Sequence, residues 1–347
     1  MPLPISPAAP WLAPLAGFSD LPFRLLCREQ GAAVACTEMV SCKGLVYGLR
    51  RKKGEESATE DLLTTTPEDT PLVVQLFGAE ADFAAEAVKI LKDRGHIWFD
   101  LNMGCSVPKV TKTGAGSAML KDLPNAMRVA EAMIREAGEG CVGFKIRLGW
   151  ENGSEVYREL APALQAAGAA WITLHPRTAR QGFGGTAEWQ ALRLLAQRLT
   201  IPLMASGDLF TAADAVACIE QTGVDGVMFA RGAIHNPAVF AAFGNYFQQR
   251  SEGGSPSLSG SEHLSGQALL TLILRHAELA HALTPGKAGR SGYPPALLKM
   301  RTVVPRYVKH LPGARALRQS LATCHSWEKL YEILESFFSE PVRPLQT

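Results

Sequence analysis

We expect neither a membrane-spanning segment nor a signal peptide, because the sequence has little that resembles either. No uncharged apolar run approaches the ~20 residues of a membrane-spanning helix, and the N-terminus has prolines in place of the basic segment of a signal peptide. Paired or densely spaced cysteines are also missing. We therefore expect no membrane association, no disulfide scaffold and no metal site, with a reducing cytoplasm as the simplest compartment. The seven cysteines are Cys27, Cys36, Cys42, Cys105, Cys141, Cys218 and Cys324.

What is present is the composition of an ordinary globular protein. The chain has 347 residues, of which 47% are hydrophobic and 20% are charged, and its net charge is +2. This length suits one large domain and a smaller one. The sequence does not specify an oligomeric state, and we take a monomer as the expectation.

Short apolar runs alternate with helical patterns over residues 1–250, which is typical of repeated βα units. About eight units are present, the number in a (β/α)8 TIM barrel. The rival fold, a doubly wound open sheet, carries a glycine-rich turn after its first strand, and this chain has none there. The expected strands are Pro10–Ala13, Ala33–Thr37, Leu72–Leu76, Trp98–Leu101, Cys141–Ile146, Trp171–Leu174, Pro202–Ala205 and Gly226–Phe229.

Helices are expected between these strands. Residues Asp82–Asp93 and Ala187–Leu199 carry apolar side chains at helical spacing, and Thr211 is placed to cap a further helix. Glycines that suit helix ends are Gly95, Gly138, Gly168 and Gly223.

Polar residues follow the apolar runs at the points where the strands end. Because the carboxyl ends of barrel strands meet on one face, we expect these side chains to form one polar pocket, the usual active site of this fold. Taken singly, His175 also fits a core histidine whose hydrogen bonds are satisfied. Lys145 also fits a lysine on the solvated rim of the barrel. The residues are Glu38, Gln75, Asn102, Lys145, His175, Ser206, Gly207, Asp208 and Arg231.

Loops of small residues follow the last two expected strands, at Ala205–Asp208 and Ala230–Ala233. This is the usual phosphate site of such barrels, and Arg231 would add a charge-assisted contact, although small turns also close barrels that bind no phosphate. A phosphate here, with Lys145 and Gln75 near the middle of the pocket and Cys105 on a loop above it, would suit flavin mononucleotide (FMN). A cation beside the N1/O2 edge of a flavin stabilises its reduced form.

Cys105 follows a short buried strand and lies on a loop. Gly114 and Gly116 give this loop backbone freedom, and Lys109 and Lys112 make it electropositive, so we expect a mobile, exposed and chemically usable thiol. The alternative is a small apolar side chain tucked under the loop.

The chain changes character after residue 250. Residues 251–265 are rich in serine and glycine and are interpreted as a linker between the barrel domain, 1–250, and a helical domain, 266–347. Pro305 is expected to break or kink the second helix of that domain. Its expected helices are Gln267–Leu283, Ala296–His310 and a third that Ser326 caps and that reaches Phe338.

The helical domain has no acidic residue between Glu278 and Glu328. In a nearly neutral chain, a one-sided basic stretch indicates a polyanion such as a nucleic acid. The alternative is a solvated helix face, but such faces usually mix both signs of charge. The basic residues are Lys287, Arg290, Lys299, Arg301, Arg306, Lys309, Arg315 and Arg318.

Six short motifs occur in order between Trp11 and Phe240. They are Pro14–Asp20, Val74–Gly78, Asp100–Cys105, Lys145–Trp150, His175–Thr178 and Ala230–Ala233. Together they resemble the motifs of the bacterial tRNA-dihydrouridine synthases, most closely the B-type branch. The helical tail, with Lys299–Arg301 and Leu311–Arg315, is similar to the tRNA-binding domain of that family.

The resemblance implies an FMN enzyme that uses NADPH to reduce the C5–C6 double bond of a uridine in tRNA. Cys105 would protonate C5 after hydride transfer from the flavin to C6, which requires a protonated thiol at neutral pH. Asn102 and Arg177 would face the uracil, and Lys109 would join the basic tail in binding RNA. The implied flavin ligands are Pro14, Leu15 and Ala16 at the ring, Gln75 and Lys145 at its polar edge, and His175, Ser206, Gly207, Asp208, Ala230 and Arg231 at the phosphate end.

Three positions depart from the family pattern. Ser106, Ser206 and Ala230 stand where proline, asparagine and glycine are usual, and the last two would lower the affinity for FMN. Two other functions stay open at this point. A free-pyrimidine oxidoreductase of the dihydroorotate or dihydropyrimidine dehydrogenase kind needs no basic tail, and a non-catalytic RNA-binding protein needs no Cys105.

Overall fold

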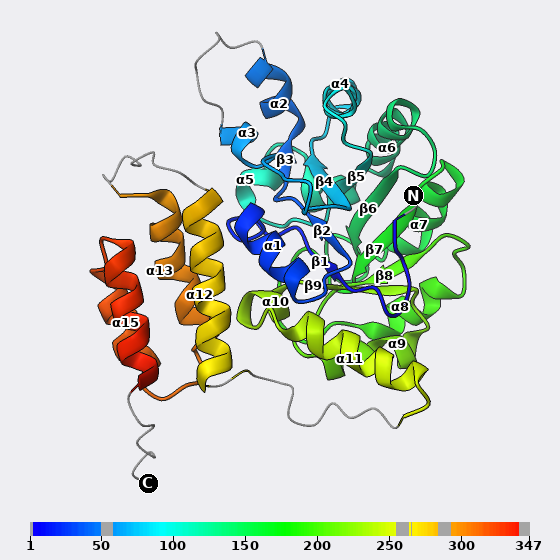
Figure 1. The fold of residues 1–347 in the computed structure, drawn as a ribbon. Helices are drawn as coiled ribbons and strands as arrows, with labels where there is room; N and C mark the ends of the chain where they lie inside the picture. The colour runs from blue at the N-terminus through cyan, green and yellow to red at the C-terminus, as the bar shows by residue number, and fades with distance from the viewer. Residues whose placement is uncertain (1–2, 50–57, 255–263, 265, 284–292, 340–347) are drawn as a thin grey trace.

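The computed structural model describes residues 3–49, 58–254, 264, 266–283 and 293–339, and its centre is a closed barrel (Figure 1). The first strand pairs in parallel with both the second and the last, so the sheet has no free edge and the predicted TIM barrel is confirmed. An open doubly wound sheet is thereby rejected. The eight barrel strands are β1 (Trp11–Leu12), β2 (Val34–Cys36), β4 (Leu72–Phe77), β5 (Trp98–Met103), β6 (Val142–Arg147), β7 (Trp171–His175), β8 (Leu203–Ala205) and β9 (Gly226–Phe229).

One additional strand, β3 (Val40–Ser41), was not predicted. It lies along the end of β4, whereas β2 pairs with the beginning of β4. Between β2 and β3 the chain leaves the sheet, and the Thr37 hydroxyl accepts a hydrogen bond from the backbone N–H of Gln75 at 3.1 Å in place of a ladder bond. This interruption brings Met39 to the wall of the pocket described below.

The strands are buried because helices cover the outside of the barrel and large side chains fill the inside. Near the starts of the strands, the rings of Trp11 and Trp171 meet edge to face with their centroids 5.4 Å apart. Leu3 and Ile5 pack against this cluster. The amino-terminal end of the barrel is therefore closed by apolar packing, which leaves the carboxyl ends of the strands for a site.

The three helical segments predicted around the barrel, Asp82–Asp93, Ala187–Leu199 and the helix after Thr211, are present. Thr211 caps α9 with a reciprocal capping box, since its side chain accepts from the Asp214 N–H at 3.0 Å. Gly138 and Gly223 end α6 and α9, and Gly95 and Gly168 follow other helix ends with positive φ. The helices around the barrel are α1 (Leu21–Glu29), α2 (Cys42–Leu49), α3 (Ala58–Asp61), α4 (Ala81–Asp93), α5 (Pro108–Thr111), the 3-10 helix η1 (Gly116–Lys121), α6 (Leu123–Ala137), α7 (Tyr157–Ala166), α8 (Trp189–Ala196), α9 (Ala212–Thr222), α10 (Arg231–His235) and α11 (Val239–Ser251).

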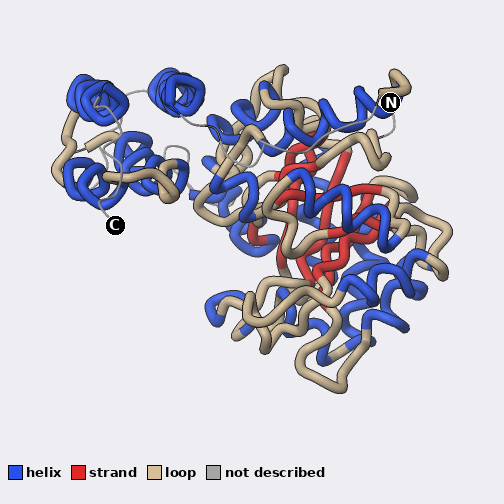
Figure 2. The backbone as a smooth tube through the Cα atoms, turned by 90° about the horizontal axis from the view of Figure 1, so that it is seen from below, coloured by secondary structure: helices blue, strands red, loops and turns tan. Residues whose placement is uncertain are grey.

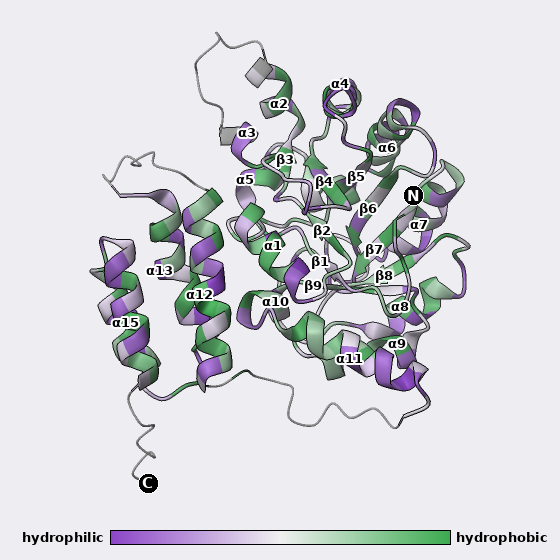
Figure 3. Cartoon of the chain, viewed as in Figure 1, coloured by the Kyte–Doolittle hydropathy of each residue, from purple (hydrophilic) through white to green (hydrophobic). Residues whose placement is uncertain are grey.

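The helices that follow α11 lie together at one side of the barrel (Figure 2). In this group α12 packs against α1, and α13 packs against α10. Ser326 caps the last helix as predicted, accepting from the Lys329 N–H at 3.1 Å, and Figure 3 shows hydrophobic and hydrophilic bands along α12 and α15. The helices are α12 (Gly266–Leu283), α13 (Pro295–Tyr307), α14 (Ala314–Ala322) and α15 (Trp327–Ser339).

Three details of this region differ from the prediction or lie outside the structure. Helix α13 passes through Pro305 and ends at Tyr307, short of the predicted His310. Helix α14 was not predicted. Most of the expected linker, 255–263 and 265, lies outside the described residues. Across the described part of the chain, no helix is both long enough and apolar enough to cross a bilayer.

Candidate active site

A pocket of about 390 Å³ lies at the carboxyl ends of the barrel strands. This volume is within the range of small-molecule and cofactor sites. Gln75 and Arg177 lie outside its wall, and Lys109 is exposed on α5. The predicted site residues that the pocket brings together are Pro14, Leu15, Ala16, Asn102, Cys105, Lys145, His175, Ser206, Gly207, Asp208, Ala230 and Arg231.

The half-buried thiol of Cys105 sits on a loop that hydrogen bonds hold in place. The side-chain oxygen of Asn102 accepts from the backbone N–H groups of Gly104 and Cys105 at 3.1 and 2.8 Å. The carbonyl oxygen of Cys105 accepts from the Ser117 N–H at 2.9 Å. The Cys105 thiol is thus half-buried where the sequence predicted it to be exposed, and hydrogen bonds anchor its loop, of which Val107, Pro108 and Lys109 are exposed.

Gly116 has a packing role in this loop. Its φ is +62°, and a Cβ atom there would lie 2.6 Å from the carbonyl oxygen of Cys105. A glycine is required because two backbone segments touch at this point. The signal that was interpreted as freedom instead marks close contact.

Arg147 lines the pocket and was not identified from the sequence. Its Nε donates to the carbonyl oxygen of Gly104 at 2.7 Å, and its Nη1 donates to the carbonyls of Thr178 and Gly182 at 2.9 and 2.8 Å. Arg147 thus ties the Cys105 loop to the loop after β7. The signal was available, since Lys145 and Arg147 are two residues apart on one strand and so share a face.

Gln75 lies beneath the pocket and reaches it through Asn102. The Asn102 Nδ2 donates to Gln75 Oε1 at 2.8 Å, and Gln75 Nε2 donates to Asp100 Oδ1 at 2.6 Å. Gln75 is 1% exposed and Asp100 is 2% exposed. Asp100, which no sequence argument selected as a site residue, is therefore linked to the pocket wall.

Burial controls the protonation of the two nitrogen bases in the pocket. Burial and the nearby Arg147 lower the pKa of Lys145 to about 8, although Asp100 acts in the opposite direction. Burial, together with Lys145, Arg147 and Arg177, holds the pKa of His175 far below its usual value, so the imidazole is neutral. Lys145 is accordingly a cation that gives up its proton more readily than an exposed lysine.

Gly207 lets the loop after β8 approach His175 closely. With φ at +116°, a Cβ atom at this position would lie 2.6 Å from His175 Cδ2. The small residues that the sequence suggested for an anion site therefore do line a narrow part of the pocket, next to Ser206 and Ala230.

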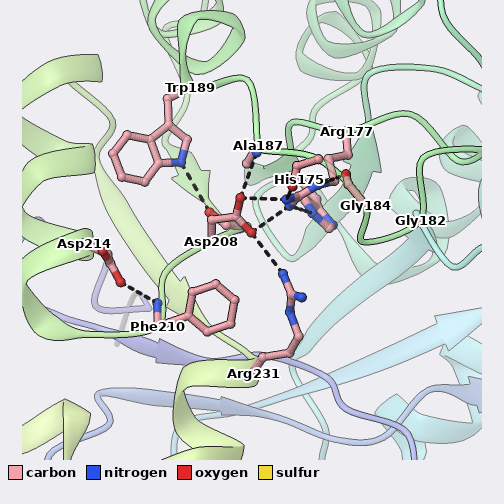
Figure 4. A network of polar contacts seen from close by, with 12 residues as sticks. His175, Arg177, Gly182, Gly184, Ala187, Trp189, Asp208, Phe210, Asp214 and Arg231 are labelled. Carbon is pink, nitrogen blue, oxygen red and sulfur yellow. Dashed lines mark hydrogen bonds and ion pairs between the residues drawn. The ribbon is translucent and has the colours of Figure 1, made fainter. Parts of the chain in front are cut away.

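Asp208 joins two arginines (Figure 4). Arg177 donates to both carboxylate oxygens at 2.8 and 2.7 Å, and Arg231 donates to Oδ1 at 3.0 Å. Burial would raise the pKa of Asp208, but the hydrogen bonds from Arg177 and from the Ala187 N–H outweigh it and the pKa is lowered. Arg177 is 1% exposed, so its guanidinium is committed to Asp208 and not to the pocket surface.

Arg231 is held at the mouth of the pocket by two aromatic rings that the sequence did not identify. Its guanidinium carbon lies 4.6 Å from the ring centroid of Phe183 and 4.7 Å from that of Phe210, and both rings are exposed. Cation–π contact with both rings and the hydrogen bond to Asp208 fix the position of the guanidinium. Isolated aromatic residues in loops carry no periodic signal by which they could have been found.

The predicted RNA-binding residues divide into two groups in the structure. Lys299 forms an ion pair with Asp20 at 2.6 Å, and Arg301 donates to the carbonyl of Ala322, so both hold the fold together. Arg306, Lys309, Arg315 and Arg318 are exposed. Lys287 and Arg290 lie outside the described residues.

Helix α13 also contacts a segment of the pocket wall. Lys299 Nζ donates to the carbonyl of Phe18 at 3.3 Å, and the guanidinium of Arg306 lies 4.7 Å from the ring centroid of Phe18. Phe18 itself lines the pocket. Helix α13, which carries these basic residues, is thus in direct contact with the pocket wall.

Comparison with known proteins identifies the family. The sequence profile of the dihydrouridine synthase (Dus) family matches residues 11–340. A protein named probable tRNA-dihydrouridine synthase 1, from Synechocystis sp., is 34% identical over 331 residues, which are 94% of this chain and 85% of that protein. A probable tRNA-dihydrouridine synthase from Mycobacterium tuberculosis is 30% identical over 96% of this chain and 83% of its own.

Solved structures support the fold only. The 6-hydroxypseudooxynicotine amine oxidase from Pseudomonas geniculata is 11% identical to this chain and aligns with a TM-score of 0.51, covering 73% of this chain and 49% of its own. The family assignment therefore depends on sequence, where the match spans nearly the whole chain. The chain belongs to the dihydrouridine synthase family, whose tRNA-dihydrouridine synthases are flavin-dependent oxidoreductases.

Proposed function

We propose that this protein is an FMN-dependent tRNA-dihydrouridine synthase of the bacterial B type, which uses NADPH to reduce a uridine in tRNA to 5,6-dihydrouridine. One observation carries the proposal: the Cys105 thiol, the Lys145 ammonium and the Arg231 guanidinium belong to the wall of one pocket. This flavin chemistry requires a proton donor, a cation at the polar edge of the ring and a group that binds the phosphate.

The residues of the pocket fit FMN. Ser206, Gly207 and Ala230 make a narrow wall without large side chains, and Arg231 gives that end its positive charge. Asp208, a carboxylate, would act there by orienting Arg231 and not by touching the phosphate. The residues proposed to hold FMN are Pro14, Leu15 and Ala16 at the ring, Lys145 at its polar edge, and His175, Ser206, Gly207, Asp208, Ala230 and Arg231 around the phosphate end. Gln75, which the resemblance implies for the polar edge, lies beneath the pocket wall with its amide bonded to Asn102 and Asp100, so we propose that it supports Asn102 in place of contact with FMN.

A flavin held by these residues would supply the hydride for C6 of the uracil. Cys105 supplies the proton: its S–H bond breaks as the C5–H bond forms, and the thiolate then takes a proton from solvent. Among the described residues, the second N–H of Asn102 meets only Met39 Sδ, a weak acceptor 3.7 Å away, so it is available to a uracil carbonyl oxygen. For Arg177 we propose support of Asp208 in place of contact with the base.

The helical domain, 266–347, is proposed to bind tRNA, with residues 1–250 as the catalytic domain and 251–265 as the linker. The exposed side chains of Arg306, Lys309, Arg315 and Arg318 are suited to phosphate contacts, and Lys109 lies exposed on the loop beside Cys105. A base must leave its stack to reach a pocket inside a barrel, as it does for other base-modifying enzymes.

The visible spectrum of the purified protein tests the proposal. We expect the bands of oxidised flavin, their loss on addition of NADPH, and their return with unmodified tRNA. Released cofactor should have the mass of FMN. A colourless protein after reconstitution with FMN, or reoxidation by free uracil as fast as by tRNA, would contradict the proposal.

A further inference from the structure

Asp100 is a buried carboxyl group that has no role in the proposed chemistry. It lies two residues before Asn102 on β5, so both side chains point to one face of the strand. Burial raises the pKa of Asp100 to about 7, against the effects of the Gln75 hydrogen bond and of Lys145. Taking a carboxyl group out of water is unfavourable, and such a group needs a hydrogen-bonding reason.

Asp100 is the acceptor at one end of a chain of two amides. Its Oδ1 accepts from Gln75, and Gln75 in turn accepts from Asn102. At the other end, Asn102 Oδ1 accepts the backbone N–H groups of Gly104 and Cys105. The chain therefore connects a carboxyl group deep in the barrel with the backbone of the thiol.

The ends of an amide have nearly the same shape, so hydrogen-bond partners decide which way it points. Asp100 requires the NH2 of Gln75, which leaves the Gln75 oxygen for the NH2 of Asn102 and the Asn102 oxygen for the Cys105 loop. Without an acceptor at position 100, the Gln75 NH2 is a buried donor with no partner, and turning it over would set it against the NH2 of Asn102. A change at one end is thus transmitted to the other.

We propose that Asp100 is a positioning residue for the proton transfer: it sets the orientation of Gln75 and Asn102 and so holds the backbone of Cys105. The inference depends on the proposed function of Cys105 as proton donor. Asp100 itself is not part of the pocket wall and touches neither the substrate nor the reacting atoms.

Three variants separate this role from a general contribution to stability. Asp100→Val removes the acceptor, whereas Asp100→Asn keeps an acceptor oxygen of similar size without the charge. Thr173→Val is the matched control, because the Thr173 hydroxyl is also buried on a barrel strand and has no hydrogen-bond partner among the described residues.

The first measurement uses flavin-free protein. The rate at which iodoacetamide alkylates Cys105 is followed by mass spectrometry of the Cys105 peptide, since other cysteines are also present. We expect Asp100→Val to change this rate by about fivefold or more, because the loop loses its anchor, with Asp100→Asn and Thr173→Val within about twofold of the wild type.

The second measurement uses FMN-loaded enzyme in stopped flow. We expect Asp100→Val to slow the reoxidation of reduced flavin by tRNA about 10- to 100-fold, as small displacements of a reacting group do. Reduction by NADPH, which does not involve Cys105, should stay within about threefold of the wild type.

Wild-type alkylation and reoxidation rates in Asp100→Val would overturn the proposal. An Asp100→Asn enzyme that behaves like Asp100→Val would also overturn the proposal, because the charge of Asp100 would then matter and not its ability to accept a hydrogen bond. If Asp100→Val does not fold, Asp100→Asn decides alone, and an alkylation rate changed by more than about fivefold would count against the proposal. Failure of the proposed function would give a different pattern. The Cys105→Ala enzyme would turn over at full rate, while Asp100→Val would still change the rate at which Cys105 is alkylated.

Discussion

The Nζ of Lys299 in α13 lies 2.6 Å from the carboxylate of Asp20, the residue that caps α1. The same lysine donates to the carbonyl of Phe18, whose side chain lines the pocket. A lysine that the sequence suggested for RNA binding is therefore part of the contact between the C-terminal helices and the barrel.

Replacing Lys299 with methionine should affect FMN binding in the pocket more than it affects tRNA binding. We expect a loss of about 1 kcal/mol in the free energy of unfolding, because the ion pair is only partly buried, and weaker FMN binding as the Phe18 segment loosens. Thermal denaturation and flavin titration measure these effects. If the flavin affinity is unchanged and the salt dependence of tRNA binding is reduced, Lys299 instead belongs with the residues proposed to bind RNA.

Replacing Arg315 or Arg318 with glutamine should have the opposite result. Both side chains are exposed on α14, and we propose that each pairs with one phosphate. Removing one such charge should lower the slope of log affinity against log salt by about 1. We expect KM for tRNA to rise while kcat and the FMN content stay the same. Filter binding at several salt concentrations, with Glu335→Gln on α15 as a charge-changing control, provides the test.

Cys105→Ala should lose the step that consumes tRNA and keep the step that consumes NADPH. The loss of a positioned proton donor typically slows a reaction about 10²- to 10⁴-fold. Single-turnover stopped flow separates the two steps. A variant that reoxidises with tRNA at the wild-type rate would assign the proton to another group.

FMN binding should weaken at high pH. Burial lowers the pKa of Lys145 to about 8, so the ammonium that we propose for the polar edge of the ring is lost as the pH rises through that value. Because binding requires the protonated form, we expect the affinity to fall about tenfold between pH 7 and pH 9. Lys145→Met should bind FMN more weakly at pH 7, without this pH dependence. A flat wild-type profile would remove Lys145 from the cofactor site.

Asp208→Asn should destabilise the fold and lower FMN retention together. Asparagine tolerates the positive φ of 54° at this position, so the change mainly removes the charge that Arg177 and Arg231 share. Leaving the buried Arg177 without its carboxylate should cost about 3 kcal/mol in the free energy of unfolding. Glu151→Gln, which breaks the exposed pair with Arg180, is the control and should cost less than about 1 kcal/mol.

The barrel could be predicted because its signals are local. The eight apolar runs identified the strands, and Thr211 and Ser326 were recognised as caps from their own neighbours in sequence. Helix α14 was missed because it is short, with only Leu317 and Leu321 buried. The strand β3 was missed because two residues carry no periodicity.

The candidate site could be predicted in part for the same reason. Polar residues at the ends of apolar runs, such as Lys145 and His175, were found from the rule that strand ends converge. Phe183 and Phe210 lie in loops 27 residues apart in sequence, and only the fold brings both to Arg231.

The sequence by itself determined the barrel, the convergence of its strand ends on one pocket and the basic character of the helical tail, because periodicity, caps and charge are properties of neighbouring residues. Only the tertiary structure decided how Cys105 is held, that Arg177 serves Asp208, and which basic residues face solvent and which join the two parts of the chain. Those outcomes depend on hydrogen bonds and ion pairs between residues far apart in sequence, such as Lys299 and Asp20, and no local pattern specifies them.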